Sequence, residues 1–279
     1  MKTEANFVVR FPKGKRKALI MSYDDGSEHD RRLVAMLNEY GLRATFHLNS
    51  GRLGIPHHIA RGEVQALYQG HEVAAHGANH LDLTTLSNEG IDREVVDDQK
   101  ALEDLVGAPV RGFAYPFGDY DERVMGRLSA LDLAYGRTTH TTGWFGLPER
   151  PLTLTTSCHH NQALELGERF LRYDAGEMAL LYVWGHSFEF DGFLSADRLK
   201  DWDYLEAFCR LLHGNPDVYY ATTLDVLDYL TAARALMGLS GTGQVRNDAH
   251  RSVWLSHAGR LFEVPPGEVL GLMDVSTAG

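Results

Sequence analysis

Two adjacent carboxylates follow the first strongly apolar segment of the chain. Asp24 and Asp25 come directly after Lys17–Tyr23 and precede Gly26. Neighbouring carboxylates raise each other's pKa, so a bound cation would explain why two of them stand together. The alternative is a polar turn in which one aspartate caps the following helix. The pair is therefore a candidate cation site that needs further ligands.

Two histidines at a spacing of four residues could supply those ligands. His76 and His80 follow the apolar segment His71–Ala75. Side chains at this spacing share one face of a helical turn, so both imidazoles can converge on one metal ion. The chain has 14 histidines, so two unrelated polar residues are the alternative. With one carboxylate, two histidines form a three-ligand site that leaves positions open for water and substrate.

Two more segments could contribute to the same site. His186 closes the apolar segment Met178–Gly185, and an imidazole at the exit of a buried strand would face the same end of the sheet. A structural histidine is the alternative interpretation. In the segment Arg111–Gly118, Pro116 and the final glycine set a turn that could aim backbone N–H groups at a reacting carbonyl. Taken alone, this turn would be an ordinary strand-to-helix connection.

Aromatic side chains suggest where a sugar could stack. Trp144 lies in the loop Thr141–Gly146, which has no other reason to be apolar, so we regard it as a candidate substrate platform. Tyr115 is a weaker candidate for substrate binding. We expect three other aromatic residues to pack in the core: Tyr182, Trp184 and Trp202.

Strand-like and helix-like segments alternate from residue 17 to residue 237. The expected strands are Lys17–Tyr23, Arg43–Leu48, His71–His76, Val110–Tyr115, Leu131–Tyr135, Leu152–Thr155, Met178–Gly185 and Val218–Ala221. The expected helices are Leu33–Tyr40, Glu63–Gln69, Ile91–Val106, Asp119–Ala130, Gln162–Leu171, Leu199–Leu212 and Leu224–Met237. Continuously apolar strands separated by helices are typical of a parallel sheet covered by helices. We predict an α/β fold, a distorted (β/α) barrel with seven or eight strands, whose active site lies at the carboxyl ends of the strands.

The last forty residues depart from this alternation. Leu239–Gly243 is rich in glycine and indicates a linker. Ser252–Leu255 and Arg260–Val264 have the pattern of a β-hairpin. We therefore expect a barrel over residues 1–238 and, over residues 239–279, a linker and a small β appendage packed on the barrel.

Composition and charge exclude several classes of protein. The 279 residues include 27 Lys and Arg against 38 Asp and Glu, a formal net charge of −11, which makes nucleic acid an unsuitable partner. The two cysteines, Cys158 and Cys209, are expected to be reduced and buried.

The longest apolar run, Met178–Trp184, is far shorter than the roughly 20 residues of a membrane span. Arg10 and Pro12 interrupt any signal-peptide pattern, so we expect a cytoplasmic protein without membrane association; the oligomeric state is not predicted.

Together these segments resemble the polysaccharide deacetylase family, also called NodB-homology domains or carbohydrate esterase family 4. The resemblance covers roughly residues 17–235. The family motif Thr-Phe-Asp-Asp-Gly corresponds to Ser22–Gly26, and His-Ser/Thr-x-x-His corresponds to His76–His80. The motif Arg-Pro-Pro-Tyr-Gly is similar to Ala114–Gly118, and the late Leu-His motif is similar to Gly185-His186.

The resemblance implies roles for individual residues. Asp25, His76 and His80 would bind a divalent metal, with Zn²⁺ expected and Co²⁺, Ni²⁺ or Mn²⁺ as alternatives. Asp24 would be the general base and His186 the proton donor. The metal and the backbone N–H of Phe117 would stabilise negative charge on the carbonyl oxygen.

Two supporting elements of the family pattern are missing. Ala114 stands where the family has the arginine that orients the base, and the sequence does not identify a replacement. The motif Asp-x-x-Asp-Trp, which supports the proton donor, has no clear counterpart. Glu189, Asp191 or the pair His159-His160 could substitute, although each residue also fits an ordinary loop position.

The sequence therefore predicts a hydrolase that removes acetyl groups from N- or O-acetylated carbohydrate. A second hypothesis keeps the fold but makes the substrate a cyclic imide or ureide, which relatives of this family open. A third hypothesis is a carbohydrate-binding relative without catalysis. The retention of Asp24 beside the expected metal ligands argues against the third hypothesis, because a binding protein gains nothing from a buried base.

Overall fold

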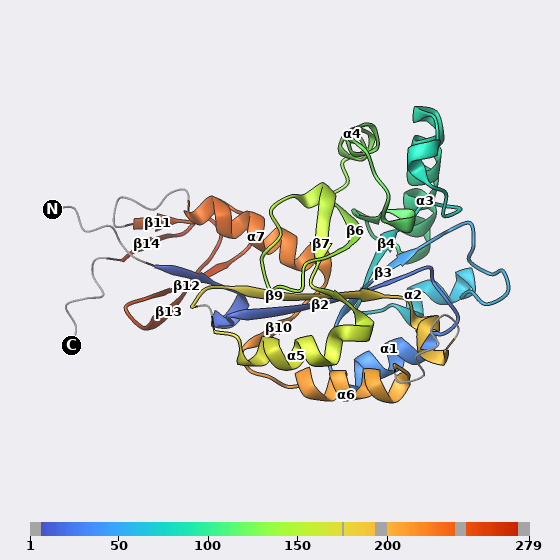
Figure 1. Ribbon diagram of the computed structural model, residues 1–279. Helices are drawn as coiled ribbons and strands as arrows, with labels where there is room; N and C mark the ends of the chain where they lie inside the picture. Colours follow the sequence, from blue (N-terminus) through green and yellow to red (C-terminus); the bar gives the residue numbers. More distant parts are fainter. Residues whose placement is uncertain (1–6, 175, 193–199, 238–243, 273–279) are drawn as a thin grey trace.

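A parallel sheet flanked by helices forms the larger part of the molecule (Figure 1). The computed structural model describes residues 7–174, 176–192, 200–237 and 244–272. The strands of the nine-stranded sheet lie in the order β7-β6-β5-β4-β3-β2-β9-β8, and β10 also pairs with β2. All these pairings are parallel. The predicted α/β fold with a parallel sheet is confirmed.

The elements follow the predicted alternation closely. The strands of the sheet are β2 (Lys17–Asp24), β3 (Ala44–Leu48), β4 (Glu72–Ala75), β5 (Gly112–Ala114), β6 (Tyr135–Thr141), β7 (Leu154–Thr156), β8 (Cys158–His159), β9 (Ala179–Gly185) and β10 (Val218–Tyr220). The helices are α1 (Asp30–Glu39), α2 (Val64–Leu67), α3 (Asn88–Val106), α4 (Glu122–Ala130), α5 (Ala163–Arg172), α6 (Trp202–Leu212) and α7 (Thr223–Met237).

One extended segment links the two sides of the sheet. β7 pairs with β6, and β8, which follows directly after Ser157, pairs with β9. Between them, the N–H of Ser157 donates to the carbonyl of Tyr182 at 2.7 Å. The chain thus passes from β6 across to β9 and curves the sheet around its inner face. This curvature brings the carboxyl ends of distant strands toward one another.

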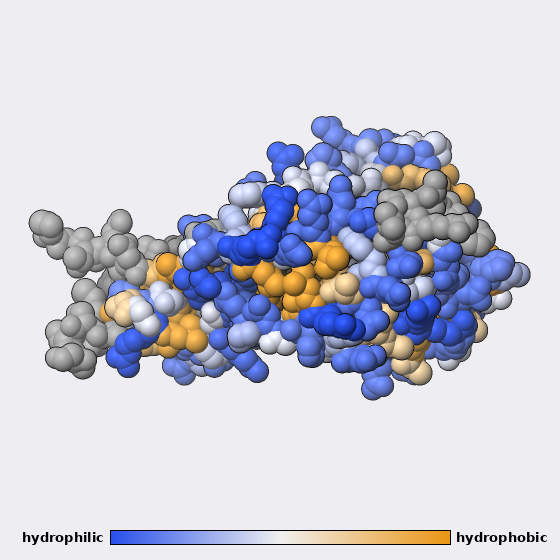
Figure 2. Space-filling model, turned by 60° about the horizontal axis from the view of Figure 1, so that its bottom comes forward, coloured by the Kyte–Doolittle hydropathy of each residue, from blue (hydrophilic) through white to orange (hydrophobic). Residues whose placement is uncertain are grey.

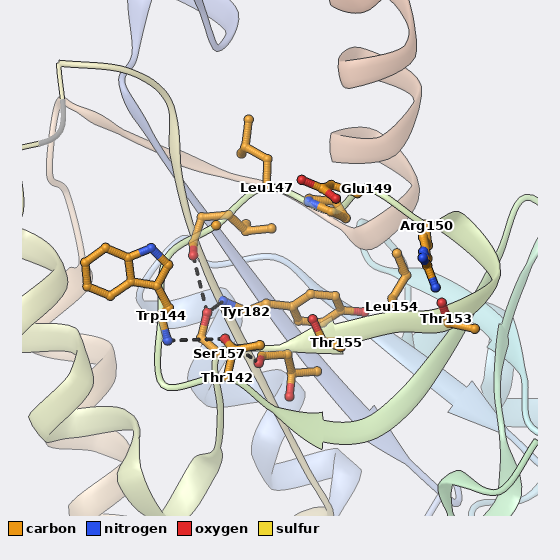
Figure 3. A pocket seen from close by; sticks show the side chains of 14 residues that line it. Thr142, Trp144, Leu147, Glu149, Arg150, Thr153, Leu154, Thr155, Ser157 and Tyr182 are labelled. Atoms are coloured by element: carbon orange, nitrogen blue, oxygen red, sulfur yellow. Dashed lines mark hydrogen bonds between the residues drawn. The ribbon is translucent and has the colours of Figure 1, made fainter.

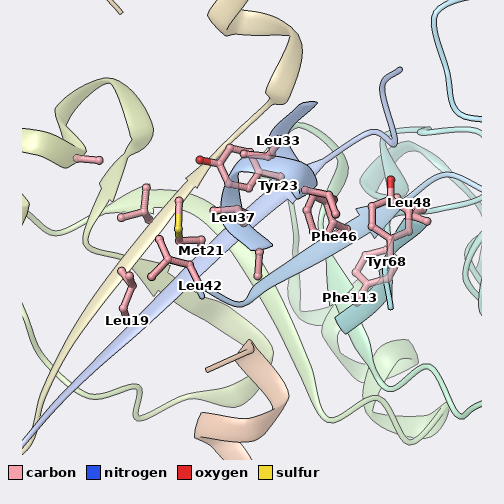
Figure 4. Packing of buried hydrophobic residues seen from close by; sticks show 14 of the residues in the cluster. Leu19, Met21, Tyr23, Leu33, Leu37, Leu42, Phe46, Leu48, Tyr68 and Phe113 are labelled. Atoms are coloured by element: carbon pink, nitrogen blue, oxygen red, sulfur yellow. The ribbon is translucent and has the colours of Figure 1, made fainter. Parts of the chain in front are cut away.

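Strand β2 shows how the core positions the first motif. All eight of its residues are buried. Leu19, Met21 and Tyr23 pack in a cluster that includes Leu33 and Leu37 of α1 (Figure 4). Successive side chains of a strand point to opposite faces, so the residues between them, down to Asp24, project to the inner face. The helix-facing residues thereby fix the direction of a carboxylate that ends the strand.

The C-terminal segment forms a separate pair of small sheets. β12 (Val253–His257) and β13 (Arg260–Val264) make the expected hairpin, and β11 (Gln244–Arg246) pairs with β14 (Val269–Gly271). The sequence did not indicate that β1 (Val8–Arg10) pairs with β12 to form a three-stranded sheet. The hydroxyl of Tyr229 in α7 accepts from the N–H of Trp254 at 2.9 Å, which joins the hairpin to the main sheet's helices. The expected linker lies outside the described residues.

One predicted strand is displaced along the chain. We expected Leu131–Tyr135 to be a strand, but the strand β6 only begins at Tyr135. Leu131 ends helix α4, and Asp132 has a φ of 57°, so these residues form a turn instead. The correction matters because it places Arg137 inside a buried strand.

The surface visible in Figure 2 is largely hydrophilic, and both cysteines are buried thiols. On the face shown in Figure 2, hydrophilic residues surround a central hydrophobic area. Cys158 and Cys209 are both free and buried, as predicted. Within the described part of the chain, the helices are too short or too polar to cross a membrane.

Candidate metal centre and catalytic residues

Asp25, His76 and His80 lie together at the carboxyl ends of β2 and β4. Oδ1 of Asp25 lies 3.6 Å from Nε2 of His76 and 3.6 Å from Nε2 of His80. The three ligand atoms all lie within 4.8 Å of one another. This Oδ1 is buried and has no hydrogen-bond partner among the described residues. A divalent metal fits the donor set, because it would satisfy the carboxylate oxygen and both ring nitrogens at once.

The backbone is turned sharply at two of these three residues. Asp25 has a φ of 78° and His80 a φ of 58°, both in the left-handed region. Such a conformation costs on the order of 1–3 kcal/mol and persists where the surroundings impose it. The N–H of Asp25 donates to the carbonyl of His47 at 3.0 Å, which holds the turn after β2. The surrounding structure therefore stabilises two unfavourable backbone conformations that direct these side chains to one point.

A backbone contact fixes the ring of His76. Its Nδ1–H donates to the carbonyl of Ala114 at 2.8 Å, which leaves Nε2 as the nitrogen that faces Asp25. Burial lowers the pKa of His76 to about 4, so the imidazole is neutral at physiological pH. A neutral ring with one nitrogen occupied by a hydrogen bond is the usual form of a metal-ligating histidine.

Asp98 on α3 supports the loop that carries this histidine. Its carboxylate accepts from the N–H of Ser50 at 2.7 Å and from the N–H of His76 at 2.8 Å. The side chain of Asn49 donates to the carbonyls of His76 and Gly77. The first turn after β4 is thus held by two side chains that the sequence analysis did not single out.

We expect Asp98→Asn to weaken both folding and metal binding. An amide has only one acceptor oxygen, so one of the two N–H groups would face an NH₂ group and lose its acceptor. An unsatisfied buried N–H costs about 1–3 kcal/mol, and disturbed support of a ligand typically lowers metal affinity by about 10–100-fold. Chemical denaturation and isothermal titration with Zn²⁺ measure the two effects. Asp97→Asn, at the exposed neighbouring position, is the control; equal behaviour of the two variants would contradict the role of Asp98.

Asp24 is paired with a buried arginine from another strand. The guanidinium of Arg137 donates to both carboxylate oxygens of Asp24, and both side chains are buried. In the parallel pair β5–β6, Arg137 lies directly opposite Ala114. Side chains opposite one another project from the same face of a sheet. The family motif would place the arginine at position 114 on β5. In this protein, the arginine that reaches Asp24 lies on the neighbouring strand β6.

The surroundings keep Asp24 ionised. Burial alone would raise its pKa, but Arg137, His76 and His47 outweigh burial and hold the pKa of Asp24 well below its usual range. Nδ1 of His47 lies 3.3 Å from Oδ1 of Asp24, and its Nε2 lies 3.2 Å from the hydroxyl of Tyr135. A buried, ionised carboxylate next to the candidate metal ligands has the protonation state that a general base requires.

His186 lies on the other side of Asp25. Its Nε2 is 3.9 Å from Oδ2 of Asp25, and its Nδ1 is 3.3 Å from Oε1 of Glu189. Burial lowers the pKa of His186, but the contact with Glu189 and the nearby Asp24 and Asp25 outweigh burial and raise it. Of the residues considered as support for this histidine, the one in contact with its ring is therefore Glu189.

The segment after β5 places its two aromatic residues differently. Phe117 is 61% exposed, has a φ of 61°, and packs its ring edge-on against His80 with 4.6 Å between the ring centres. Its backbone thus turns next to the metal ligands. Tyr115 is only 1% exposed, and its hydroxyl donates to the carbonyl of Leu152. The prediction that Tyr115 binds substrate is wrong, because the adjoining strand and loop bury its ring.

Trp144 lies in a different hollow from the metal ligands. It is 52% exposed and lines a hollow with Thr142, Leu147 and Tyr182 (Figure 3). None of the three residues of the metal group lines this hollow. A second hollow does contain Asp25; its other lining residues are Ser27, His29, Arg52, His57, His58 and Phe188. Contact of Trp144 with a substrate would therefore require a ligand long enough to extend away from the metal group.

The site as a whole defines a class of protein. A parallel α/β sheet carries, at the carboxyl ends of its strands, two histidines and a carboxylate around one point, with an ionised aspartate and a histidine of raised pKa beside them. Three protein ligands with open positions are the arrangement of metal-dependent hydrolases. Residues 12–136 match the family model described as polysaccharide deacetylase. The resemblance drawn from the motifs is confirmed there.

One curated relative illustrates this similarity. The chain is 36% identical over 107 residues to chitin deacetylase 1 from Cryptococcus neoformans. The matched region covers 37% of this chain and 22% of that relative. It spans less than half the length of each of the curated relatives compared first.

Two solved structures share the fold over most of the chain. The Xyl-CE4 domain of a multidomain xylanase from the hindgut metagenome of Trinervitermes trinervoides has a TM-score of 0.54 at 16% identity, covering 78% of this chain and 92% of that domain. A mutant, with restored enzymatic activity, of a CE4 family pseudoenzyme from Bacillus anthracis has a TM-score of 0.52 at 16% identity, covering 79% and 70%. At these identities the likeness concerns the fold alone.

Proposed function

We propose that the protein is a divalent-metal-dependent hydrolase that removes acetyl groups from acetylated carbohydrate. The observation that carries the proposal is the convergence of Asp25, His76 and His80 around a buried carboxylate oxygen that has no hydrogen-bond partner in the described part of the chain. The family match over residues 12–136 supports the reaction class, and the name of the chitin deacetylase relative supports an N-acetylated sugar as substrate. Two imidazoles and one carboxylate are a common ligand set for Zn²⁺, and they also accept Co²⁺, Ni²⁺ or Mn²⁺.

The residues around the metal group divide the proton transfers between them. When bound, the metal would lower the pKa of water and polarise the acetyl carbonyl. Asp24, kept ionised by Arg137, accepts the proton of the attacking water. The backbone N–H of Phe117 donates to the carbonyl oxygen as negative charge develops on it. His186 then donates a proton to the departing amine or alcohol.

Acetate release from defined substrates tests the proposal. Metal-free protein and protein restored with Zn²⁺ or Co²⁺ would be compared on acetylated chito- and xylo-oligosaccharides, and on small cyclic imides and ureides. We expect metal-dependent acetate release that the double variant Asp25→Asn/His80→Ala lacks. Ring opening of the cyclic amides without acetate release would replace the proposed substrate class. Saturable glycan binding without any turnover would show that the protein is not an enzyme of this kind.

The role of His186 predicts a dependence on the leaving group. His186→Ala should lower kcat by about 100-fold or more for an amide, because the departing amine needs a proton. An activated ester releases a stable anion, so the same variant should hydrolyse it nearly as fast as the wild type. Parallel kinetics on an N-acetyl sugar and on 4-nitrophenyl acetate measure the difference. The proton-donor role is wrong if both substrates are slowed equally.

A further inference from the structure

A second group of two histidines and one carboxylate lies beside the first. His159 ends β8, His160 begins the short helix η6 (His160–Gln162), and Glu189 lies in the short helix η7 (Ser187–Asp191). Oε2 of Glu189 is 3.0 Å from Nε2 of His159 and 2.8 Å from Nε2 of His160. The three potential ligand atoms lie within 4.8 Å of one another, as in the group formed by Asp25, His76 and His80.

The polar atoms of this group are poorly satisfied without an ion. Nδ1 of His160 is buried and has no hydrogen-bond partner among the described residues, and Oε2 of Glu189, although within 3.0 Å of both Nε2 atoms, receives no well-aligned hydrogen bond from them. His160 is only 2% exposed, so water does not reach its ring nitrogens. Buried polar atoms normally have a partner, and an exception requires an explanation.

The first metal group has the same features. There too, a buried carboxylate oxygen without a well-aligned hydrogen bond from the described residues faces the Nε2 atoms of two histidines, at 3.6 Å rather than at 2.8 and 3.0 Å. Converging Nε2 atoms around one carboxylate oxygen present three lone pairs to one point. A cation would coordinate all three, whereas a hydrogen bond to Oε2 of Glu189 needs a well-aligned N–H from an imidazole.

From this arrangement we infer that His159, His160 and Glu189 bind a second divalent cation of the zinc type. A site with two imidazoles and one carboxylate favours Zn²⁺, Co²⁺ and Ni²⁺. Mg²⁺ and Ca²⁺ prefer sites made of oxygen ligands alone. The side chains of His159 and Glu189 are 23% and 19% exposed, so water can complete the coordination from the open side. The inference goes beyond the proposed function, because it concerns binding at residues outside the first metal group.

The second site would be linked to the first through His186. The other oxygen of Glu189, Oε1, lies 3.3 Å from Nδ1 of His186, whose Nε2 faces Asp25. A cation on Oε2 would hold the Glu189 carboxylate in place and thereby orient the ring of His186. Glu189 would then act as a positioning residue that joins the two groups, as outer partners of ligands do at metal sites.

Counting bound ions in matched variants tests the inference. Metal-free protein would be titrated with Zn²⁺ by calorimetry, dialysed and analysed for metal by mass spectrometry, with circular dichroism as the check of folding. We expect two ions in the wild type, one in Asp25→Asn/His80→Ala, one in His159→Ala/Glu189→Gln, and none when all four substitutions are combined. His250→Ala, at an exposed histidine of the C-terminal segment, should keep both ions.

Two results would overturn the second site. One is a single ion in the wild type with none in Asp25→Asn/His80→Ala. The other is two ions retained in His159→Ala/Glu189→Gln, which would place the second ion elsewhere. Because His159 is partly exposed, the single variant His159→Ala should fold even if the double variant does not, and should weaken the second binding step by at least about 10-fold. The ion count is separate from acetate release, so a protein that binds two ions without deacetylating would refute only the proposed function.

Discussion

Replacing Asp24 with asparagine should abolish turnover while the bound metal remains. The amide cannot accept the proton of the attacking water, and loss of a general base typically costs about 10²–10⁴-fold in rate. The proposed ligands Asp25, His76 and His80 are unchanged in this variant. Acetate-release kinetics and metal analysis of the same preparation measure the two properties together.

Asp25→Asn is the matched control, because it makes the same chemical change at the adjacent residue. This variant should lose the metal and the activity together, since it replaces the carboxylate that faces both imidazoles. Asp24→Asn should also be less stable by about 3–5 kcal/mol, because the buried guanidinium of Arg137 loses its counter-ion. Full activity of Asp24→Asn would refute its role as the base, and loss of metal from it would make Asp24 a ligand.

The parallel sheet could be predicted because several of its strands contain long apolar runs. Buried strands such as β2 and β9 give continuous hydrophobic segments, and glycines or polar residues end most of the helices between them. The strand β6 was misplaced for a local reason: Leu131 and Leu133 are apolar, but they cap a helix and form a turn. Burial of a short apolar stretch does not by itself distinguish a strand from a turn packed on the core.

The convergence of Asp25, His76 and His80 could be predicted because these residues closely follow the ends of strands. The side chains of Asp25 and His76 need only the strand before each of them to be placed at the carboxyl edge of the sheet. Arg137, His47 and Asp98 could not be found in this way. Each reaches the site through the pairing of strands or the docking of a helix, which depends on tertiary packing rather than on a local pattern.

The contrast between Tyr115 and Phe117 shows the same limit. Both are aromatic residues of one short turn, yet one is buried and the other is 61% exposed beside His80. The positive φ of Phe117 reverses the direction of the chain between them, and the sequence around Pro116 allows but does not require that reversal. Which aromatic residue faces a ligand therefore depends on one backbone angle.

Arg137→Ala should impair catalysis without removing a residue that contacts the metal. Arg137 holds the carboxylate of Asp24 on both oxygens, and a small misplacement of a catalytic group can cost about 100-fold in rate. We expect kcat to fall by about this factor with a smaller change in KM. The pairing also lowers the pKa of Asp24, so its removal should raise that pKa. The acid limb of the profile of kcat/KM against pH should therefore move to higher pH.

Moving the arginine back to its family position is the decisive control for this role. Ala114 and Arg137 lie opposite one another on β5 and β6, so their side chains leave the same face of the sheet. In the double variant Ala114→Arg/Arg137→Ala, an arginine on β5 should again reach Asp24, restoring much of kcat and returning the acid limb toward its original pH. Arg137→Lys should recover less, because an ammonium group is a more strongly hydrated point charge on a differently shaped side chain and is less suited than a guanidinium to a buried ion pair. If Arg137→Ala left both kcat and the acid limb unchanged, the arginine would stabilise the fold without orienting Asp24. If the double variant stayed as impaired as Arg137→Ala, the geometry of β6 itself would be needed, and the two arginine positions would not be equivalent.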